Sequence, residues 1–283
     1  MSKIIVAVDF SDCSINAFFH ALSIAQHCSN DILLVWVQKP PSEKDKFEKL
    51  TGDPTKEVKI QFEEMIGKYQ AELPHNKITY KLRKGTVYKE ITAEAKESKT
   101  MLVVAGTHGA SGFDEFWIGS NANKIVSASP CPVITIRAGI NIQRPLTKIV
   151  LPIDKTVETR QKATFTGYLA KNHNAEIHIL SLYTSSVKAI RREVNIYAGQ
   201  VELYFKQEGV RHKMSSIDCT NISDAMIQYA LKTEANLISI MTEQESKTSN
   251  LWMGPYAHQT VNHSPIPVLS IHSKETYAVG SGF

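Results

Sequence analysis

The amino-acid sequence contains two copies of one pattern, and this internal repeat restricts the possible folds more than any other feature. Lys3–Asp9 reads KIIVAVD, and Lys148–Asp154 reads KIVLPID. Ser129–Ile136 reads SPCPVITI, and Ser264–Ile271 reads SPIPVLSI, 135 residues later. A repeat of this length predicts two tandem copies of one domain. A chain of 283 residues has room for two domains of ordinary size.

Within the first copy, short apolar runs alternate with segments of helical periodicity. β-branched apolar runs predict strands at 3–8, 32–37, 78–82, 101–105 and 133–136. Apolar residues at helical spacing predict helices at 14–27, 58–69, 87–95 and 121–128, and the polar stretch 39–56 predicts a loop. Strands that alternate with helices form a parallel sheet covered on both faces, with right-handed crossovers.

The second copy repeats this order. Its predicted strands lie at 148–154, 176–182, 210–216, 236–241 and 268–271, and its predicted helices include 187–207 and 222–231. The expected fold class is therefore α/β, with two tandem, doubly wound, five-stranded parallel-sheet domains. We expect the domains to span 1–138 and 147–275, because a polar segment with one glycine and one proline lies between them.

Composition and charge exclude several classes of function. The net charge of +4 is spread along the chain, so no nucleic-acid partner is expected. The densest basic cluster is Lys81, Arg83 and Lys84, which we interpret as the solvated edge of a sheet. No run of about 18 apolar residues predicts a membrane span. The four cysteines form no C-x-x-C pair, so we expect reduced thiols, no metal site and a cytoplasmic location.

A glycine-bearing loop follows the fourth predicted strand. Gly106, Gly109, Gly119 and Ser120 fit the pattern Gly-x2-Gly-x9-Gly-Ser/Thr, and a predicted helix begins directly after it. Glycines allow positive φ and the close approach of a ligand. The N-terminus of a helix suits a phosphate. Ser120 and Asn121 add side-chain donors, and Ser120 could cap the helix. The alternative is that these glycines serve only tight turns.

This pattern resembles the universal stress protein family, in its tandem two-domain form. The sequences SPCPV at 129–133 and VAVDFS at 6–11 resemble the same family. The resemblance implies a nucleotide-binding α-hydrolase-like fold, in which the loop wraps the phosphates of ATP or another adenine nucleotide. It also implies that the two copies pair through their last strands, Val133–Ile136 and Val268–Ile271, as a pseudo-dimer within one chain.

The resemblance further assigns roles to single residues. Asp9 would lie beside the adenosine, next to the fourth strand, and the backbone near Val37 would border the adenine. The alternative for Asp9 is a cap for the following helix, and for the loop residue His108 it is simple solvation. The expected nucleotide-binding residues are Asp9, Val37, Gly106, Thr107, His108, Gly109, Gly119, Ser120 and Asn121.

The second copy has lost much of the glycine pattern. At the same offset Met241 replaces Gly106, Gln244 replaces Gly109, and Pro255 replaces Ser120. Pro255 has no N–H to offer a phosphate, although proline is well tolerated in the first turn of a helix. Glu243 and Glu245 would repel a polyphosphate. We therefore expect nucleotide in the first copy and little or none in the second, which would be a structural or partner-facing half.

The sequence shows no catalytic apparatus of a familiar kind. It lacks Gly-x-Ser-x-Gly and a Walker loop ending in Gly-Lys-Ser/Thr, and we assign no catalytic residue and no protein-held metal. The favoured hypothesis is a stress-response regulator in which ATP, with or without Mg²⁺, switches a surface seen by a protein partner. The alternatives are a nucleotide-independent scaffold that works through dimerisation, and a slow metal-dependent ATPase that uses Asp9.

Overall fold

The computed structural model describes residues 2–40, 54–107, 119–137, 145–242 and 254–273. In the first half, strands and helices alternate as the sequence predicts. The elements are β1 (Lys3–Ala7), α1 (Asp12–Cys28), β2 (Asp31–Gln38), α2 (Pro54–Tyr69), the 3₁₀ helix η1 (Gln70–Glu72), β3 (Ile78–Lys84), α3 (Val87–Glu97), β4 (Thr100–Gly106), α4 (Ser120–Ala128) and β5 (Val133–Ile136).

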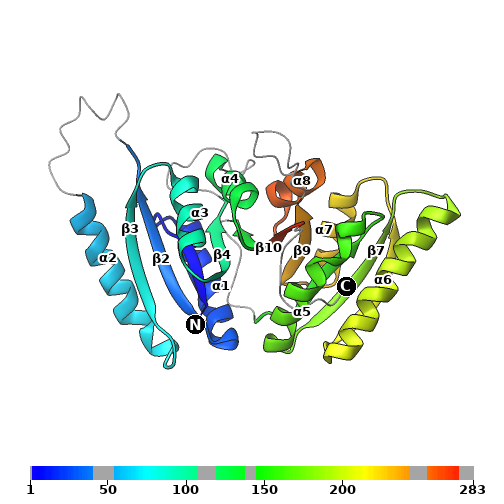
Figure 1. Ribbon diagram of the computed structural model, residues 1–283, viewed down its shortest axis with the longest axis horizontal. Coiled ribbons are helices and arrows are strands. Elements are labelled where there is room, and N and C mark those ends of the chain that lie inside the picture. The colour runs from blue at the N-terminus through cyan, green and yellow to red at the C-terminus, as the bar shows by residue number, and fades with distance from the viewer. Residues whose placement is uncertain (1, 41–53, 108–118, 138–144, 243–253, 274–283) are drawn as a thin grey trace.

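The second half follows the same order. Its elements are β6 (Lys148–Ile153), the 3₁₀ helix η2 (Val157–Arg160), α5 (Lys162–His173), β7 (Glu176–Tyr183), α6 (Lys188–Glu208), β8 (His212–Asp218), α7 (Ile222–Lys232), β9 (Leu237–Thr242), α8 (Pro255–His263) and β10 (Val268–His272). The two halves lie side by side, with α2 and α6 at the outer ends (Figure 1).

All ten described strands form one sheet in the order β3-β2-β1-β4-β5-β10-β9-β6-β7-β8. Each half is a parallel sheet, and the halves meet where β10 runs antiparallel to β5, with Val268 opposite Thr135 and Ser270 opposite Val133. The predicted pairing through the last strands is therefore confirmed. In both halves the strand order reverses between the first and fourth strands, as in a doubly wound domain.

A hydrophobic core lies on each face of this sheet. One core contains buried residues of α1, α2, α5 and α6, and the other contains residues of α3, α4, α7 and α8. Side chains of a strand alternate between the faces, so Ile4 and Val6 enter the first core and Ile5 enters the second. Each core contains residues of both halves, so the halves share their packing as well as their sheet.

Two features of the helices differ from the sequence expectation. Helix α2 begins at Pro54, so the last residues of the predicted loop 39–56 are helical, and proline is well suited to this first position. Helix α5 has no counterpart among the predicted segments. Its buried face includes Lys162, Thr166 and Gly167, which break the apolar periodicity that would have revealed it.

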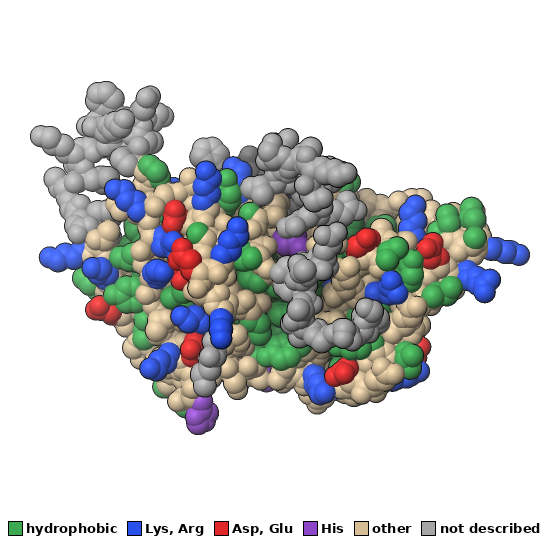
Figure 2. All heavy atoms as spheres, viewed as in Figure 1, with side chains coloured by type: hydrophobic (Ala, Val, Ile, Leu, Met, Phe, Trp, Pro, Cys, Tyr) green, Lys and Arg blue, Asp and Glu red, His purple; other side chains and the backbone are tan. Residues whose placement is uncertain are grey.

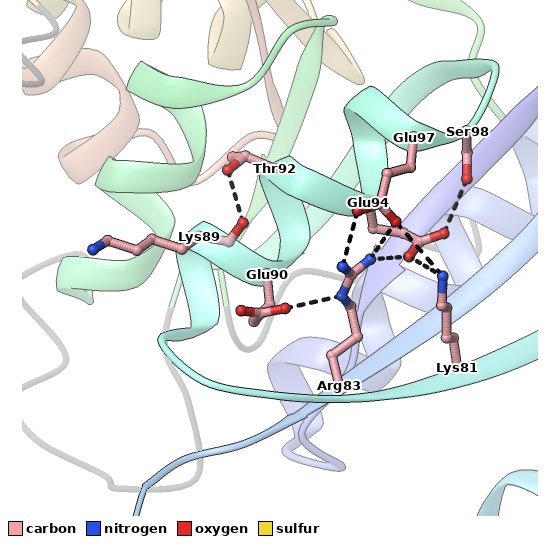
Figure 3. A network of polar contacts seen from close by, with 8 residues as sticks. All are labelled: Lys81, Arg83, Lys89, Glu90, Thr92, Glu94, Glu97 and Ser98. Atoms are coloured by element: carbon pink, nitrogen blue, oxygen red, sulfur yellow. Dashed lines mark hydrogen bonds and ion pairs between the residues drawn. The ribbon is translucent and has the colours of Figure 1, made fainter.

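Strand β3 is an outer strand, and its residues Lys81 and Lys84 are exposed as predicted, whereas Arg83 is half-buried and paired with glutamates of α3. Arg83 donates to Glu90 (Nε–Oε2 2.9 Å) and to Glu97 (Nη1–Oε2 2.9 Å), and it also pairs with Glu94. Lys81 Nζ lies 2.7 Å from Glu94 Oε2 (Figure 3). These ion pairs fasten α3 to the edge of the sheet.

No helix among the described residues is both long and apolar enough to cross a bilayer. The charges are also mixed on the surface. In the view of Figure 2, Lys and Arg side chains occur over both halves, with Asp and Glu side chains among them. The net charge of +4 is therefore not gathered over one half in this view.

Candidate functional site

The candidate site lies at the carboxyl ends of β1 and β4. These strands are parallel neighbours, with Ala7 opposite Ala105, and the sheet continues in opposite directions from them, to β2 and to β5. In open α/β sheets, ligands bind at such a reversal because the loops on either side diverge and leave a crevice. The expected neighbourhood of the first and fourth strands is confirmed.

Asp9 occupies a tight turn between β1 and α1. Its Oδ1 accepts hydrogen bonds from the Ser11 backbone N–H (3.1 Å) and from Ser11 Oγ (2.5 Å). Ser11 in turn caps α1, because its Oγ accepts from the Ser14 N–H at 3.3 Å. Phe10, between them, has a positive φ of 61°, which is unusual for a side chain of this size. The Asp9 carboxylate is thus held at an exposed position at the strand end.

The same turn occurs in the second half. Asp154 Oδ1 accepts from the Thr156 backbone N–H (2.7 Å) and from Thr156 Oγ1 (2.6 Å). The Asp154 N–H bonds to Thr159 Oγ1, as the Asp9 N–H bonds to Ser14 Oγ. Because both halves have this arrangement, the aspartate has a local role in shaping the turn, whatever further role Asp9 has with a ligand.

Val37 lies near the end of β2, at the same end of the sheet. The Val8 N–H donates to the Val35 carbonyl at 3.0 Å, and Ala7 pairs with Val35, so Val37 lies level with the turn that holds Asp9. Its side chain is buried in the core on the α3 side, and its partner in β3 is Arg83. Only its backbone could therefore border a ligand at the strand ends.

The start of α4 is tied directly to the end of β4. The Gly119 N–H donates to the Thr107 carbonyl at 2.6 Å, and the Thr107 N–H donates to the Ile136 carbonyl at 2.8 Å. Thr107 is buried, Asn121 is half-buried and Ser120 is exposed. The first-turn N–H groups of a helix face its N-terminal end, so those of α4 face the carboxyl ends of β4 and β5. His108 and Gly109 lie outside the described residues.

Two expectations about this loop are corrected. Gly119, with φ −58° and ψ 140°, is the N-cap of α4 and Ser120 is its first residue, so Ser120 does not cap the helix. Gly106 and Gly119 also do not have the positive φ expected of them. A Cβ on Gly106 would lie 2.9 Å from Cys13 Sγ, and one on Gly119 would lie 3.0 Å from the Thr107 oxygen. Both glycines are needed for packing within the protein.

The second half is built differently at this point. Met241, which replaces Gly106, is buried at the end of β9. The chain after Asp154 forms the 3₁₀ helix η2, and the α-helix starts only at Lys162, whereas α1 starts three residues after Asp9. Pro255 is the first residue of α8, as expected, and the preceding Gly254 has a φ of 44°. The backbone between Asp154 and α5, and at Gly254 before α8, thus differs from the corresponding segments of the first half.

Lys162 is a functional candidate that the sequence reasoning missed. It is 1% exposed, and its Nζ donates to the Thr159 carbonyl (2.6 Å) and Thr159 Oγ1 (3.1 Å). Burial lowers the pKa of Lys162 to about 8, although the nearby Asp154 carboxylate acts in the opposite direction. In the first half, Ala17 takes the corresponding position. A buried lysine near Asp154 therefore distinguishes the second half from the first.

Metal-binding side chains do not gather in the described part of the chain. Across these residues, no group of three or more His, Cys, Asp or Glu side chains could hold a metal ion. Cys13, Cys28, Cys131 and Cys219 are all described, and none of them forms a disulfide. The carboxyl ends of β1 and β4 thus bring together the Asp9 turn, the Gly106–Thr107 strand end and the Gly119–Asn121 helix start.

Fold and site together define a chain of two doubly wound α/β domains, each with a reversal of strand order between its first and fourth strands. The chain belongs to the universal stress protein family, whose sequence model matches residues 1–137 and 145–272. Universal stress protein MJ0531 of Methanocaldococcus jannaschii is 28% identical over 142 residues, which cover 48% of this chain and 81% of that protein.

Solved structures with a similar fold cover nearly the whole chain. A universal stress protein from Archaeoglobus fulgidus matches with a TM-score of 0.73 at 15% identity, over 96% of this chain and 98% of that one. A functionally unknown protein, PA1789, from Pseudomonas aeruginosa matches with a TM-score of 0.63 at 15% identity, over 96% and 93%. At this identity the likeness concerns the fold alone.

Proposed function

We propose that this protein is a cytoplasmic stress-response regulator that binds ATP or another adenine nucleotide in its first domain. The observation that carries the proposal is the 2.6 Å hydrogen bond from the Gly119 N–H to the Thr107 carbonyl. It fixes the N-terminal end of α4 at the strand-order reversal, beside the Asp9 turn. An anion there meets backbone N–H groups and the positive end of a helix dipole.

Each expected residue has a role in this proposal. The phosphates bind along the loop and the helix start, the Asp9 carboxylate binds a hydroxyl of the adenosine, and the Val37 backbone borders the adenine. Mg²⁺, when present, is carried by the phosphates. The residues on the phosphate side are Gly106, Thr107, His108, Gly109, Gly119, Ser120 and Asn121. The domains are 1–138, which binds the nucleotide, and 147–275, which does not.

The nucleotide acts as a switch for a protein partner. A phosphate bound at the start of α4 changes the position of Gly119, whose N–H is bonded to the Thr107 carbonyl. Thr107 is itself bonded to Ile136 at the end of β5. Strand β5 pairs with β10 of the second half. A change in the position of α4 can therefore reach both halves through one continuous set of hydrogen bonds. The nucleotide shifts the protein between two conformations by the difference in its affinity for them.

Thermal unfolding with and without Mg-ATP tests this function. Binding at a hundred times Kd stabilises the folded state by about 2.7 kcal/mol, which gives a clear increase in Tm. The increase is expected in the wild type and not in Gly109→Gln, which copies Gln244 of the second half. The converse variant, Gln244→Gly, is the matched control and is expected to keep the increase. No increase in the wild type would contradict nucleotide binding.

The nucleotide-independent scaffold remains the second candidate function. The observation that favours it is that β5 and β10 already join the two halves into one sheet through backbone pairing alone. In that case the oligomeric state and partner binding would be the same with and without nucleotide. Sedimentation of the full chain in both conditions separates this candidate from the switch, and phosphate release measured with Mg-ATP tests for slow hydrolysis.

A further inference from the structure

Arg137 is a cation at the candidate site that the sequence reasoning did not use. It directly follows β5, the neighbour of β4 in the sheet. Gly106 pairs with Ile136, and the Thr107 N–H donates to the Ile136 carbonyl at 2.8 Å. Arg137 therefore directly follows the residue that is hydrogen-bonded to Thr107, and Thr107 is in turn bonded to Gly119 at the start of α4.

The side chain of Arg137 lies on the same face of the sheet as α4. Along β5, Ile134 and Ile136 enter the core on the α1 side, and Val133 enters the core on the α4 side. Alternation places the next odd-numbered residues, Thr135 and Arg137, on the α4 side. The guanidinium agrees with this placement, because its Nη1 donates to the Asn262 carbonyl at 3.3 Å in the last turn of α8, which covers the same face.

The corresponding position in the second half is chemically different. His272 takes the place of Arg137, and Thr242 takes the place of Thr107. His272 is buried, and its Nδ1 lies 2.7 Å from Thr242 Oγ1. The position of Arg137 therefore differs between the halves, as those of Gly106, Gly109 and Ser120 do. The first half has a half-buried guanidinium here, whereas the second half has the imidazole of His272, bonded to Thr242 at the end of β9.

We propose that Arg137 is a phosphate-binding residue of the first domain and that the second domain holds it in place through the C-terminal end of α8. A guanidinium presents several N–H groups in a fixed plane, so one edge can bond a helix carbonyl while another bonds phosphate oxygens. The cation is also favourable at the negative end of the α8 dipole. This inference rests on the proposed nucleotide site and adds a contribution of the second domain to it.

The test is a series of ligands with an increasing number of phosphates. Titration calorimetry of the full chain measures the Kd of adenosine, AMP, ADP and Mg-ATP for the wild type, Arg137→Gln and Arg137→Lys. In Arg137→Gln the Kd of ATP is expected to rise roughly 10- to 100-fold, the size of a lost hydrogen bond to a charged group. The Kd of adenosine is expected to change less than about twofold, since adenosine has no phosphate to pair with the arginine. Arg137→Lys is expected to recover part of the loss because it keeps the charge.

Arg211→Gln is the matched control. Arg211 also donates from Nη1 to a carbonyl at the end of a helix, Asn174 at 3.1 Å, but it precedes β8, an outer strand that β10, β9, β6 and β7 separate from β5. Its substitution is expected to leave every Kd unchanged. An equal loss for adenosine and ATP in Arg137→Gln, or equal ATP affinities for the Gln, Lys and wild-type proteins, would overturn the role of Arg137. Absence of binding to all four ligands in the wild type would instead overturn the nucleotide site.

Hydrogen exchange tests the contribution of the second domain. If Arg137 connects the phosphates to α8, ATP is expected to slow amide exchange in 258–264 of the wild type. The slowing is expected to be absent in Arg137→Gln at a concentration of ATP that saturates the variant. Unchanged exchange in this segment of the ATP-saturated wild type would overturn the connection to α8.

Discussion

His27 and His173 stack face to face across the boundary between the two halves, with ring centroids 4.4 Å apart and 23° between the ring planes. His27 belongs to α1 and His173 to α5. His20, also in α1, is 8% exposed, and its Nε2 has no hydrogen-bond partner within the described structure. Cys28 of α1 follows His27 directly and lies near Tyr168 of α5, across the same boundary. The contact between α1 and α5 therefore contains buried histidine side chains, whose charged forms are disfavoured by burial.

This cluster predicts that acid weakens the protein. Burial and, to a smaller extent, the nearby His173 together lower the pKa of His20 to about 4. Burial and then His27 lower the pKa of His173. The unfolded chain binds these protons from about pH 6.5 downward, whereas the folded chain does not. The contribution of these histidines to the free energy of unfolding is therefore nearly constant above about pH 7 and becomes unfavourable below it, by about 2 kcal/mol for His20 between pH 7 and 5.

Urea denaturation of His20→Gln checks the acid effect. The variant is expected to lose less stability than the wild type between pH 7 and 5. The exposed His75→Gln serves as the control and is expected to follow the wild-type curve. Parallel curves for His20→Gln and the wild type would show that His20 does not titrate as the structure predicts.

Lys162 predicts a second pH effect, in the alkaline range. Because its folded pKa of about 8 is below the ordinary value of 10.5, the unfolded chain holds the proton more tightly between these values. Stability is therefore expected to rise with pH above about 8, by on the order of 2 kcal/mol by pH 9.5. Lys162→Met is expected to remove this rise and to leave stability at pH 7 equal or greater. Urea denaturation between pH 7 and 9.5 measures it, with the exposed Lys232→Met as control.

Gly106→Ala is expected to destabilise the fold without any ligand. The added Cβ would lie 2.9 Å from Cys13 Sγ and 3.0 Å from the Cys13 carbonyl carbon, so the start of α1 must shift. Overpacking of this kind costs roughly 1–3 kcal/mol. Gly67→Ala is the control, because nothing lies within 4 Å of its added Cβ, and in a helix it is expected to stabilise by up to about 1 kcal/mol. If urea denaturation gave a change in the free energy of unfolding of the same sign for both variants, the packing role of Gly106 would be contradicted.

The ion pairs between β3 and α3 predict a large effect of Arg83→Met. The Glu94 side chain is 4% exposed. Burial alone would raise its pKa, but hydrogen bonds from Lys81, Ser98 and Arg83 lower it overall. Loss of Arg83 leaves a buried carboxylate with fewer donors, at a cost of roughly 3 kcal/mol. The exposed pair Lys206–Glu202 gives the comparison, since Lys206→Met is expected to cost less than about 0.5 kcal/mol in the same urea experiment.

The sequence by itself determined the repeat, the α/β class, the order of strands along the chain and the carboxyl-end position of Asp9 and Gly106. Periodicity and turn residues act over a few positions, so they can be recognised in one dimension. The pairing of β5 with β10 was predictable because the last strands occur twice and the family resemblance indicated how they meet. Helix α5 was missed for the converse reason: polar residues on its buried face hide its period.

Only the tertiary structure decided why particular residues are present. Gly106 is required by Cys13, Arg83 is held by three glutamates of α3, and Arg137 reaches the end of α8. The contact between His27 and His173 joins residues far apart in the chain. No local pattern encodes such contacts, because they depend on how the strands are ordered and which face each side chain takes. The chemistry of this site therefore follows from packing between distant segments, whereas its position in the fold follows from the sequence pattern.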